Sequence, residues 1–593
     1  MTSWLPRIAA ILSGFILTFA YPRWDFESAV WFWLLPLLWA LWPPKPSSFN
    51  PASRNRSSFF LGYLAGLAFF IPNLFWIRHS SRVIAGAVDD RWIGWGPELM
   101  GFGAVIGLSG YCALYFALWA WFVARYARPQ LEVLTKGTWQ SSTLESLRSS
   151  FLAAAAWVAC EWLRSTTVFT GFGWNGLGVG LHQNQVLIQI ADVVGVMGLS
   201  FLPVFVVCTG WHTLTRLVML YRGTGTCRTR LDFTFAMIVL LGVVGYGYSR
   251  MITVNAAMRN KEVPPITVRT LLVQPNIPQV VRWTGEGAPQ IYQRMADLTR
   301  LYAEARDGQT YVDLAIWPES ALPINLYDVY DQLPPGEHVK YFNDLLSLGD
   351  FSLLSGVDVL VQRDEPHTSM ALFRGGVDAQ FSTTQFHHKY HLVPFGEYLP
   401  FREIPPFSFL KGVLPGDFRP GTKTEPLLLA KPKVQIIPLI CFEDTVGRVA
   451  RLFVRPEPQM IVNVTNDGWF LQSEQTAVHL ANAKFRAIEL RRPMVRATNT
   501  GISCFIDTLG KVTSTFADPE TGNTFLEGCL PGEVLVPIQG EMTIYARHGD
   551  WFALLMLGGC AVVVASGILR VMRLTARNSG TPAPPSAPTP LSE

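Results

Sequence analysis

One cysteine stands at the end of an apolar run, directly before two acidic residues. The run covers residues 436–440 and continues as Cys441-Phe442-Glu443-Asp444. A thiol is mostly protonated near neutral pH, because its reference pKa is about 8.5. A nucleophilic cysteine therefore needs a base or a positive charge nearby. Taken alone, Cys441 is more simply explained as a small buried apolar residue, so its chemistry depends on what other segments bring to it.

Two other segments offer a base and a cation. Glu319 follows the apolar run 312–317 and Pro318, so we expect it at the end of a strand, where the active sites of α/β proteins gather. Lys389 lies in a run that continues as His387-His388-Lys389-Tyr390-His391. Each has an ordinary alternative, a helix cap for Glu319 and a solvated basic face for Lys389. Taken with Cys441, they predict nucleophilic catalysis.

The order strand-Glu, Lys, strand-Cys, with these flanking residues, resembles the nitrilase or carbon–nitrogen hydrolase superfamily over residues 266–537. The resemblance implies an α-β-β-α sandwich. It implies a triad in which Glu319 is the general base, Lys389 stabilises the tetrahedral intermediate and Cys441 is the nucleophile. It also implies that Glu397, in Val-Pro-Phe-Gly-Glu-Tyr, orients the lysine. No cofactor is expected, and no CxxC or Cys/His spacing indicates a metal site.

The composition predicts a membrane protein with a large extramembrane part. The chain has 593 residues, of which 49% are hydrophobic and only 16% charged, too apolar for an ordinary soluble protein. Eight charge-poor stretches predict membrane helices: 8–22, 28–44, 57–77, 100–124, 151–163, 193–215, 233–249 and 551–569. One of them carries Glu161. An ionisable residue at such depth indicates function by default, whereas a position at a helix end near the interface would be ordinary.

These stretches predict the following domains. A bundle of seven spans occupies residues 1–250, an α/β domain follows in 251–550, a C-terminal membrane helix covers 551–571, and a disordered tail covers 572–593. Lys and Arg are concentrated in the loops after the second, fourth and sixth spans and in the tail. The positive-inside rule then places both termini in the cytoplasm and the α/β domain on the outer side of the membrane.

The chain's partners are expected to be lipid rather than nucleic acid. The formal net charge of +4 is small and comes mostly from the cytoplasmic loops, so no basic surface for nucleic acid is predicted. We expect a monomer in the bilayer. In an oxidising compartment Cys504 and Cys529 can form a disulfide, which the sequence does not decide.

Membrane spans around such a domain narrow the resemblance to the apolipoprotein N-acyltransferase family. Its sequences are similar to residues 157–164, 170–174, 189–201, 273–279, 463–470 and 486–493. The resemblance implies transfer of a fatty acyl chain from a phospholipid, usually phosphatidylethanolamine, to the α-amine of the S-diacylglyceryl cysteine of an apolipoprotein, through a thioester on Cys441. It also implies that the membrane is a bacterial inner membrane and that the α/β domain lies in the periplasm. A membrane-tethered amidase would use the same triad on a small amide. A ligand-binding sensor or transporter would form no covalent intermediate.

Several further residues are candidates for substrate contact or site architecture: Trp283, Phe442, Glu443, Asn466, Trp469 and Arg492. Each is equally well explained as a buried aromatic or ion-paired core residue. The segment 399–424 is rich in Pro, Phe and Gly, with Phe407 and Phe409 among the breakers. It predicts either a packed irregular loop or an apolar lid that keeps the site dry.

Overall fold

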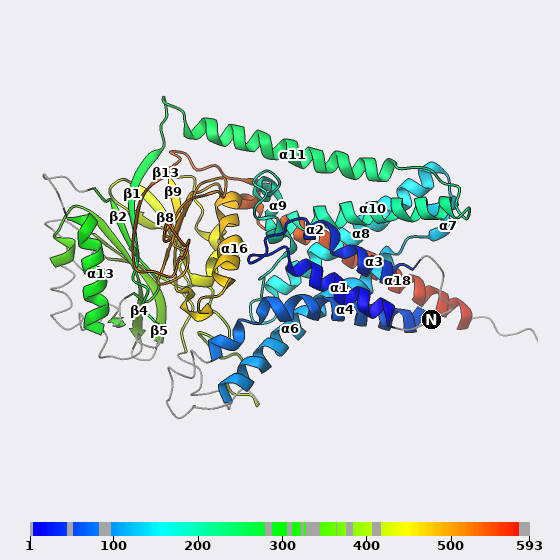
Figure 1. The fold of residues 1–593 in the computed structure, drawn as a ribbon, viewed down its shortest axis with the longest axis horizontal. Helices are drawn as coiled ribbons and strands as arrows, with labels where there is room; N and C mark the ends of the chain where they lie inside the picture. Colours follow the sequence, from blue (N-terminus) through cyan, green and yellow to red (C-terminus); the bar gives the residue numbers. More distant parts are fainter. Residues whose placement is uncertain are drawn as a thin grey trace, which may run out of the picture.

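Helices and strands occupy different parts of the chain in the computed structural model, which describes residues 4–43, 51–81, 96–278, 288–304, 311–321, 325–327, 344–362, 365–374, 384–405 and 417–579. A bundle of helices precedes the strands, and one long helix follows them (Figure 1). The main bundle helices are α1 (Leu5–Thr18), α2 (Ala29–Phe32), α3 (Leu34–Leu41), α4 (Pro51–Leu74), α6 (Gly96–Phe122), α8 (Trp139–Thr166), α9 (Ala191–Leu199), α10 (Phe201–Tyr221), α11 (Leu231–Met258) and α18 (Trp551–Ser579).

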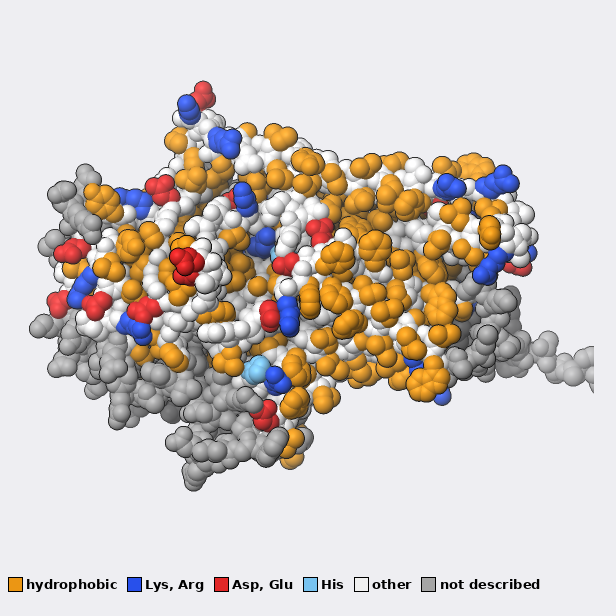
Figure 2. Space-filling view, viewed as in Figure 1, with side chains coloured by type: hydrophobic (Ala, Val, Ile, Leu, Met, Phe, Trp, Pro, Cys, Tyr) orange, Lys and Arg blue, Asp and Glu red, His pale blue; other side chains and the backbone are white. Residues whose placement is uncertain are grey.

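Within the described part of the chain, five stretches are long and apolar enough to cross a membrane: Arg56–Leu74, Glu98–Ala127, Phe201–Tyr221, Leu231–Met258 and Trp551–Arg573. Three shorter helical stretches are also apolar, namely Leu5–Thr18, Ala29–Leu41 and Leu187–Leu199. Apolar side chains cover most of the visible bundle surface, and Lys and Arg gather at its end away from the sheets (Figure 2). This pattern is typical of helices in lipid. The count of eight spans stays a prediction.

Two predicted spans differ from the helices that form. The stretch 193–215 is not one helix, because Gly195 has a φ of 71° and a new helix, α10, begins at Phe201. The stretch 151–163 is the second half of the 28-residue α8, whose first half buries serines rather than apolar side chains. Hydropathy alone missed that half because buried hydroxyls there bond to other helices, as Ser149 does to the carbonyl of Ala127.

The strands form two sheets. The first has the order β13-β1-β2-β4-β5-β6, with β3 also paired to β4. Its strands are β1 (Ile266–Gln274), β2 (Leu314–Trp317), β3 (Asn325–Tyr327), β4 (Ser352–Gln362), β5 (Glu365–Arg374), β6 (Gln385–His388) and β13 (Gly528–Val536). The second has the order β12-β11-β10-β9-β8-β7. Its strands are β7 (Leu427–Leu429), β8 (Val434–Ile440), β9 (Gln459–Thr465), β10 (Met494–Thr498), β11 (Cys504–Ile506) and β12 (Val512–Thr515).

The predicted α-β-β-α layering is confirmed (Figure 1). The inner faces of the two sheets share a core that includes Leu272 and Leu354 from the first and Ile436 and Val462 from the second. Helix α13 (Ala288–Ala303) packs on the outer face of the first sheet. Helix α16 (Gln475–Leu490) packs on the outer face of the second. Strands β1, β2 and β4 are parallel, as are β8, β9 and β10, so each sheet gathers carboxyl ends at one edge.

No disulfide joins Cys504 to Cys529. All eight cysteines lie within the described residues and all are free thiols. Cys504 belongs to the core under α16, whereas the thiol of Cys529 lies 3.4 Å from the Leu298 carbonyl oxygen under α13. The two residues therefore lie on opposite outer faces of the sandwich.

Helix α16 joins the sandwich to the bundle. Of its 16 residues, only Ala477 and Leu480 are not buried. Ala483 and Ala487 contact the second sheet, while Ala481 and Phe485 belong to the core of the bundle. A helix that packs against a sheet on one side and a helical bundle on the other is expected to be buried on all sides.

A charged tie follows directly after α16. The guanidinium of Arg491 forms a buried ion pair with Asp192 of α9, with Nη2 2.7 Å from Oδ2. Its Nη1 donates to the side-chain oxygen of Gln189 at 2.6 Å. Arg250 of α11 pairs with the same Asp192 carboxylate at 2.9 Å. These bonds hold the sandwich on the bundle at one side.

We expect Arg491→Met to lower thermal stability strongly, because it leaves the Asp192 carboxylate buried with one cation fewer. Breaking a buried pair from one side typically costs about 3–5 kcal/mol. The measurement is the unfolding midpoint in detergent, with the exposed Arg547→Met as control. Adding Asp192→Asn to Arg491→Met should restore part of the loss, and a fully additive double variant would contradict the account.

Candidate active site

Cys441 begins a tight turn at the carboxyl end of β8. Its backbone is left-handed, with a φ of 53°, which is uncommon for a residue other than glycine. The residues that follow form a 3₁₀ turn over Cys441–Thr445. The side chain of Asn463, from β9, donates to the Cys441 carbonyl at 3.1 Å. Residues other than glycine with a left-handed backbone cluster at functional sites, and they persist only where the surrounding contacts hold them in that conformation.

Lys389 is a fully buried cation between two carboxylates. Its ammonium nitrogen lies 2.6 Å from Oε1 of Glu397 and 3.6 Å from Oε1 of Glu319, and its side chain is 0% exposed. Burial acts to lower the pKa of Lys389, but the charges of Glu397 and Glu319 outweigh it and raise that pKa. The other oxygen of Glu397 accepts from the Val393 backbone N–H at 2.8 Å, which fixes the carboxylate in place. Lys389 is therefore a permanent positive charge.

Glu319 is held at the end of β2 by a close backbone approach. A Cβ on Gly356 of β4 would lie 2.5 Å from both the Glu319 Cα and the Pro318 carbonyl oxygen. The Gly356 N–H donates to that carbonyl at 3.2 Å, and the Ala321 N–H donates to the Gly356 carbonyl at 2.9 Å. Only glycine fits there without a shift, and Gly356 was not anticipated from the sequence.

Glu443 connects the lysine segment to the cysteine turn. One carboxylate oxygen accepts from the backbone N–H groups of Tyr390 and His391, each at 2.8 Å, and the other accepts from Ile440 at 2.8 Å. Burial raises the pKa of Glu443 to about 7, although Lys389 and these three N–H groups act against it. A single carboxylate thus holds two chain segments 50 residues apart, the one after Lys389 and the one before Cys441.

These contacts bring the three residues of the predicted triad to one place. Burial and the nearby Glu319 charge raise the pKa of the Cys441 thiol well above its usual value, and Lys389 opposes them only in part. The resting thiol is therefore neutral, and a reaction at sulfur requires a base that takes its proton during attack. Glu319 and Lys389 both act electrostatically on the thiol, which makes them the candidates for that base and for the fixed charge that an oxyanion requires.

Phe442 is held in a stack of rings from both parts of the protein. Its ring is parallel to those of Trp174 and Phe172, with centroids 5.8 Å and 6.3 Å away, and to the ring of His391. Trp174 and Phe172 follow α8, so the bundle supplies one wall beside the cysteine. Sequence analysis singled out the segment 170–174 as similar to the family but did not place it at the site.

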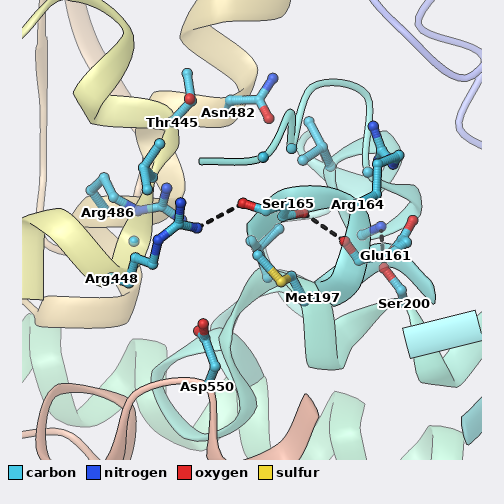
Figure 3. Close-up of a pocket in the computed structure, with 18 of the residues that line it drawn as sticks. Glu161, Arg164, Ser165, Met197, Ser200, Thr445, Arg448, Asn482, Arg486 and Asp550 are labelled. Atoms are coloured by element: carbon cyan, nitrogen blue, oxygen red, sulfur yellow. Dashed lines mark hydrogen bonds between the residues drawn. The ribbon is translucent and has the colours of Figure 1, made fainter. Parts of the chain in front are cut away.

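The turn that carries these rings is strained. Val168, Phe169, Thr170 and Gly171 all have positive φ values. The turn is stabilised from the sandwich by Arg448, which donates to the carbonyls of Ser165 at 2.8 Å and Thr170 at 2.6 Å. Figure 3 shows Arg448 reaching toward Ser165 across a cavity between the bundle and the sandwich. Glu161, Ser200, Phe442, Arg486 and Asp550 also line this cavity.

The other predicted residues have different surroundings. Asn466 caps the turn after β9 and accepts from the Asn499 amide at 3.0 Å. Trp469 lies in that turn, and its carbonyl accepts from Ser80 at 3.0 Å. Arg492 is fully buried and donates to backbone carbonyls, including those of Arg455 and Glu541. Among the described residues no bond joins Arg492 to the triad. Trp283, Phe407 and Phe409 lie outside the described residues.

Some residues at the strand ends were missed by sequence analysis. The Asn499 side chain accepts from the Ile277 N–H at 3.2 Å and donates to the Ile277 carbonyl at 2.8 Å. Gln274 accepts hydrogen bonds from Thr498 and Ser503 of the other sheet. These amides tie the edges of the two sheets together. The available signals were that Asn466 and Asn499 directly follow β9 and β10, and that Gln274 lies in the segment 273–279.

Comparison with known proteins agrees with this architecture. Residues 272–525 match the family model described as Carbon-nitrogen hydrolase, and residues 13–209 match Apolipoprotein N-acyltransferase N-terminal domain. A solved carbon–nitrogen hydrolase from Helicobacter pylori G27 is similar at 14% identity, covers 45% of this chain and 88% of its own, and has a TM-score of 0.32. The sandwich is the part of the chain that matches the Carbon-nitrogen hydrolase family model.

Two relatives are similar over almost the whole chain. The apolipoprotein N-acyltransferase of Geobacter metallireducens is 30% identical over 599 residues, covering 95% of this chain and 96% of the relative. That of Brucella melitensis is 30% identical over 536 residues, covering 87% and 88%. The chain belongs to the apolipoprotein N-acyltransferase family. Five helices in the described part of the chain are long and apolar enough to cross a membrane, and together with the family they identify a membrane protein.

We expect Glu443→Gln to slow chemistry at Cys441 by about 10-fold to 100-fold while the fold is retained. A neutral amide has one acceptor oxygen, so it cannot accept from all three N–H groups, and one or more stay unsatisfied. The measurement is the rate of Cys441 modification by a small electrophile, with the exposed Glu520→Gln as control. A rate equal to that of the unmodified protein would show that Glu443 does not position the turn.

Proposed function

We propose that this protein transfers a fatty acyl chain from a phospholipid to the N-terminal amine of the S-diacylglyceryl cysteine of an apolipoprotein, through a thioester on Cys441. As a family member it is an acyltransferase of the carbon–nitrogen hydrolase superfamily. The single observation that carries the proposal is the buried Lys389 between Glu319 and Glu397, beside a cysteine walled by rings from the membrane bundle. Phosphatidylethanolamine is the proposed donor.

In the first half-reaction Glu319 takes the thiol proton as sulfur attacks the ester carbonyl of the phospholipid. The tetrahedral oxyanion is stabilised by Lys389 and by a backbone N–H near Phe442. Losing one such donor typically costs about 10²-fold to 10³-fold in rate. The C–O bond then breaks, Glu319 returns the proton to the leaving oxygen, and a lysophospholipid departs. The acyl chain remains as a thioester.

In the second half-reaction the amine of the diacylated cysteine attacks the thioester. Glu319 accepts a proton from the amine nitrogen, and the C–S bond breaks to give an amide. Glu319 then returns the proton to the leaving sulfur, which restores the free thiol. This is ping-pong chemistry, in which one base serves both steps. A dry site protects the thioester from water.

The proposed topology explains how lipid reaches the site. Eight spans with both termini in the cytoplasm would place the sandwich in the periplasm, on the inner membrane.

The rings of Phe395 and Phe401 each lie 5.5 Å from Phe169 of the bundle. Phe401 is 57% exposed and Ile404 is 55% exposed, which supports contact between segment 399–405 and the lipid surface. We propose that this segment is part of an apolar lid.

The first test is intact-mass analysis of the purified full chain in detergent after incubation with phosphatidylethanolamine. We expect a fatty-acyl adduct that is absent in Cys441→Ala and retained in the control Cys529→Ala. A diacylated lipopeptide should then discharge the adduct and become N-acylated. An adduct that only water discharges would favour the amidase, and a folded protein that never forms one would favour a sensor or transporter.

The second test concerns the seam between the bundle and the sandwich. We expect Phe169→Ser to raise the ratio of thioester hydrolysis to acyl transfer several-fold, because the polar side chain opens the contact with Phe395 and Phe401 to water. Leu428→Ser, which is 43% exposed at the edge of the second sheet, is the matched control. An unchanged ratio in Phe169→Ser would count against the lid.

A further inference from the structure

Four charged side chains are buried together directly behind the cysteine turn. Asp444 belongs to that turn, Asp467 to the turn after β9, His479 to α16 and Arg496 to β10. None is more than 1% exposed. The proposed reaction uses none of them. They therefore need a separate explanation, because buried charges are costly unless paired.

The positions of the ring nitrogens decide the protonation of His479. Its Nε2 lies 2.8 Å from Oδ1 of Asp444, and its Nδ1 lies 2.9 Å from Oδ1 of Asp467. Ionised carboxylates only accept hydrogen bonds, and a neutral imidazole has only one N–H. Both contacts are hydrogen bonds only when both ring nitrogens carry protons. The geometry thus favours the imidazolium.

The charges around His479 balance. Arg496 pairs with the second oxygen of Asp444 and lies 3.7 Å from the second oxygen of Asp467. Two anions and two cations then cancel within one buried cluster. Nη2 of Arg496 also lies 3.4 Å from Nδ1 of His479, and a hydrogen bond there would require an unprotonated Nδ1. That separation is longer than the 2.9 Å between Nδ1 and Asp467, so the carboxylate contact is the stronger one. Among the described residues, the rings of Trp174 and Phe470 also face the imidazole and carry no charge. Burial acts to lower the pKa of His479 and Arg496 acts likewise, but Asp444 and Asp467 outweigh both and raise it to about 9.

The cluster connects to the nucleophile through the backbone. Asp444 lies three residues after Cys441 in the same 3₁₀ turn. Its carbonyl also accepts from Arg486 of α16 at 3.2 Å. Asp467 anchors the turn that contains Trp469. The imidazole therefore joins the carboxyl ends of two neighbouring parallel strands, β8 and β9, to the helix that contacts the membrane bundle.

We infer that His479 is a positioning residue that acts as an imidazolium, and that its two hydrogen bonds to Asp444 and Asp467 hold the Cys441 turn in the geometry required for acyl transfer. This inference rests on the proposed function, because acyl transfer is the reaction that the turn serves. When the imidazolium loses a proton, one of its ring nitrogens no longer donates a hydrogen bond. The lone pair of that nitrogen then faces a carboxylate oxygen and is repelled by it. The turn is then released while Glu319 and Lys389 are unchanged.

The direct test is nitrogen-15 NMR of the full chain labelled at histidine, with His479→Gln to assign the signal. We expect both ring nitrogens of His479 to carry protons at pH 7.5. In Asp444→Asn the proton should be lost about 1–3 pH units lower, since one opposite charge is removed. A neutral ring at pH 7.5 in the unmodified protein would overturn the inference. This readout does not depend on activity.

The functional test is the pH profile of Cys441 acylation by phosphatidylethanolamine, measured by intact mass. We expect the alkaline loss of rate to move to lower pH in Asp444→Asn by the same interval as the NMR titration. The exposed His548→Gln should keep the original profile. If Asp444→Asn does not fold, Asp467→Asn replaces it. An unshifted profile with a shifted titration would overturn the positioning role, whereas absence of acylation in every protein, including the unmodified one, would overturn the proposed function instead.

Stability should change with pH in the same window. The ordinary pKa of histidine is about 6.5, and in the folded protein that of His479 is raised to about 9. The stabilisation is therefore complete below about pH 6.5 and is lost as the pH rises through about 9. The unfolding midpoint of the unmodified protein should fall more steeply over that range than that of His479→Gln. Parallel slopes would contradict the charged state.

Discussion

The site depends on one fully buried ammonium group. Lys389 has no contact with water, so its charge is tolerable only because Glu397 and Glu319 lie beside it. That requirement places Glu319 at the end of β2 and keeps Glu397 bonded to the segment after the lysine. Burial and the charge of Glu319 make the surroundings of Cys441 unfavourable to a resting thiolate, and Lys389 offsets this only in part. A base that acts only during attack is the chemistry that this electrostatic arrangement permits.

The membrane bundle is part of the site and does more than anchor it. Rings from the turn after α8 pack against Phe442, and Arg448 of the sandwich caps the carbonyls of that same turn. Helix α16 is buried on both sides, and Arg491 at its end pairs with α9. Movement of the bundle relative to the sandwich would therefore displace the rings that pack against Phe442, the residue next to Cys441.

Much of the sandwich followed from local patterns. The apolar runs 312–317 and 436–440 end at the same residues as β2 and β8, because apolar runs between breakers identify buried strands. Strand β13 was missed, since Gly528, Pro531 and Gly532 lie inside it. Its nine pairs with β1, an interaction across more than 250 residues, stabilise it despite those breakers. The first half of α8 was missed because its contacts are polar.

The sequence by itself determined which groups are available: a thiol, a carboxylate and an amine at the ends of three segments, and apolar stretches long enough for lipid. Tertiary structure alone decided which charges are buried together. Arg492 was singled out from the sequence, yet its hydrogen bonds within the described part of the chain go to backbone carbonyls. His479 was not singled out, and it bridges two buried carboxylates. The physical reason is that a side chain's ionisation and role depend on its loss of water and on partners distant in sequence, and neither is encoded in its immediate neighbours.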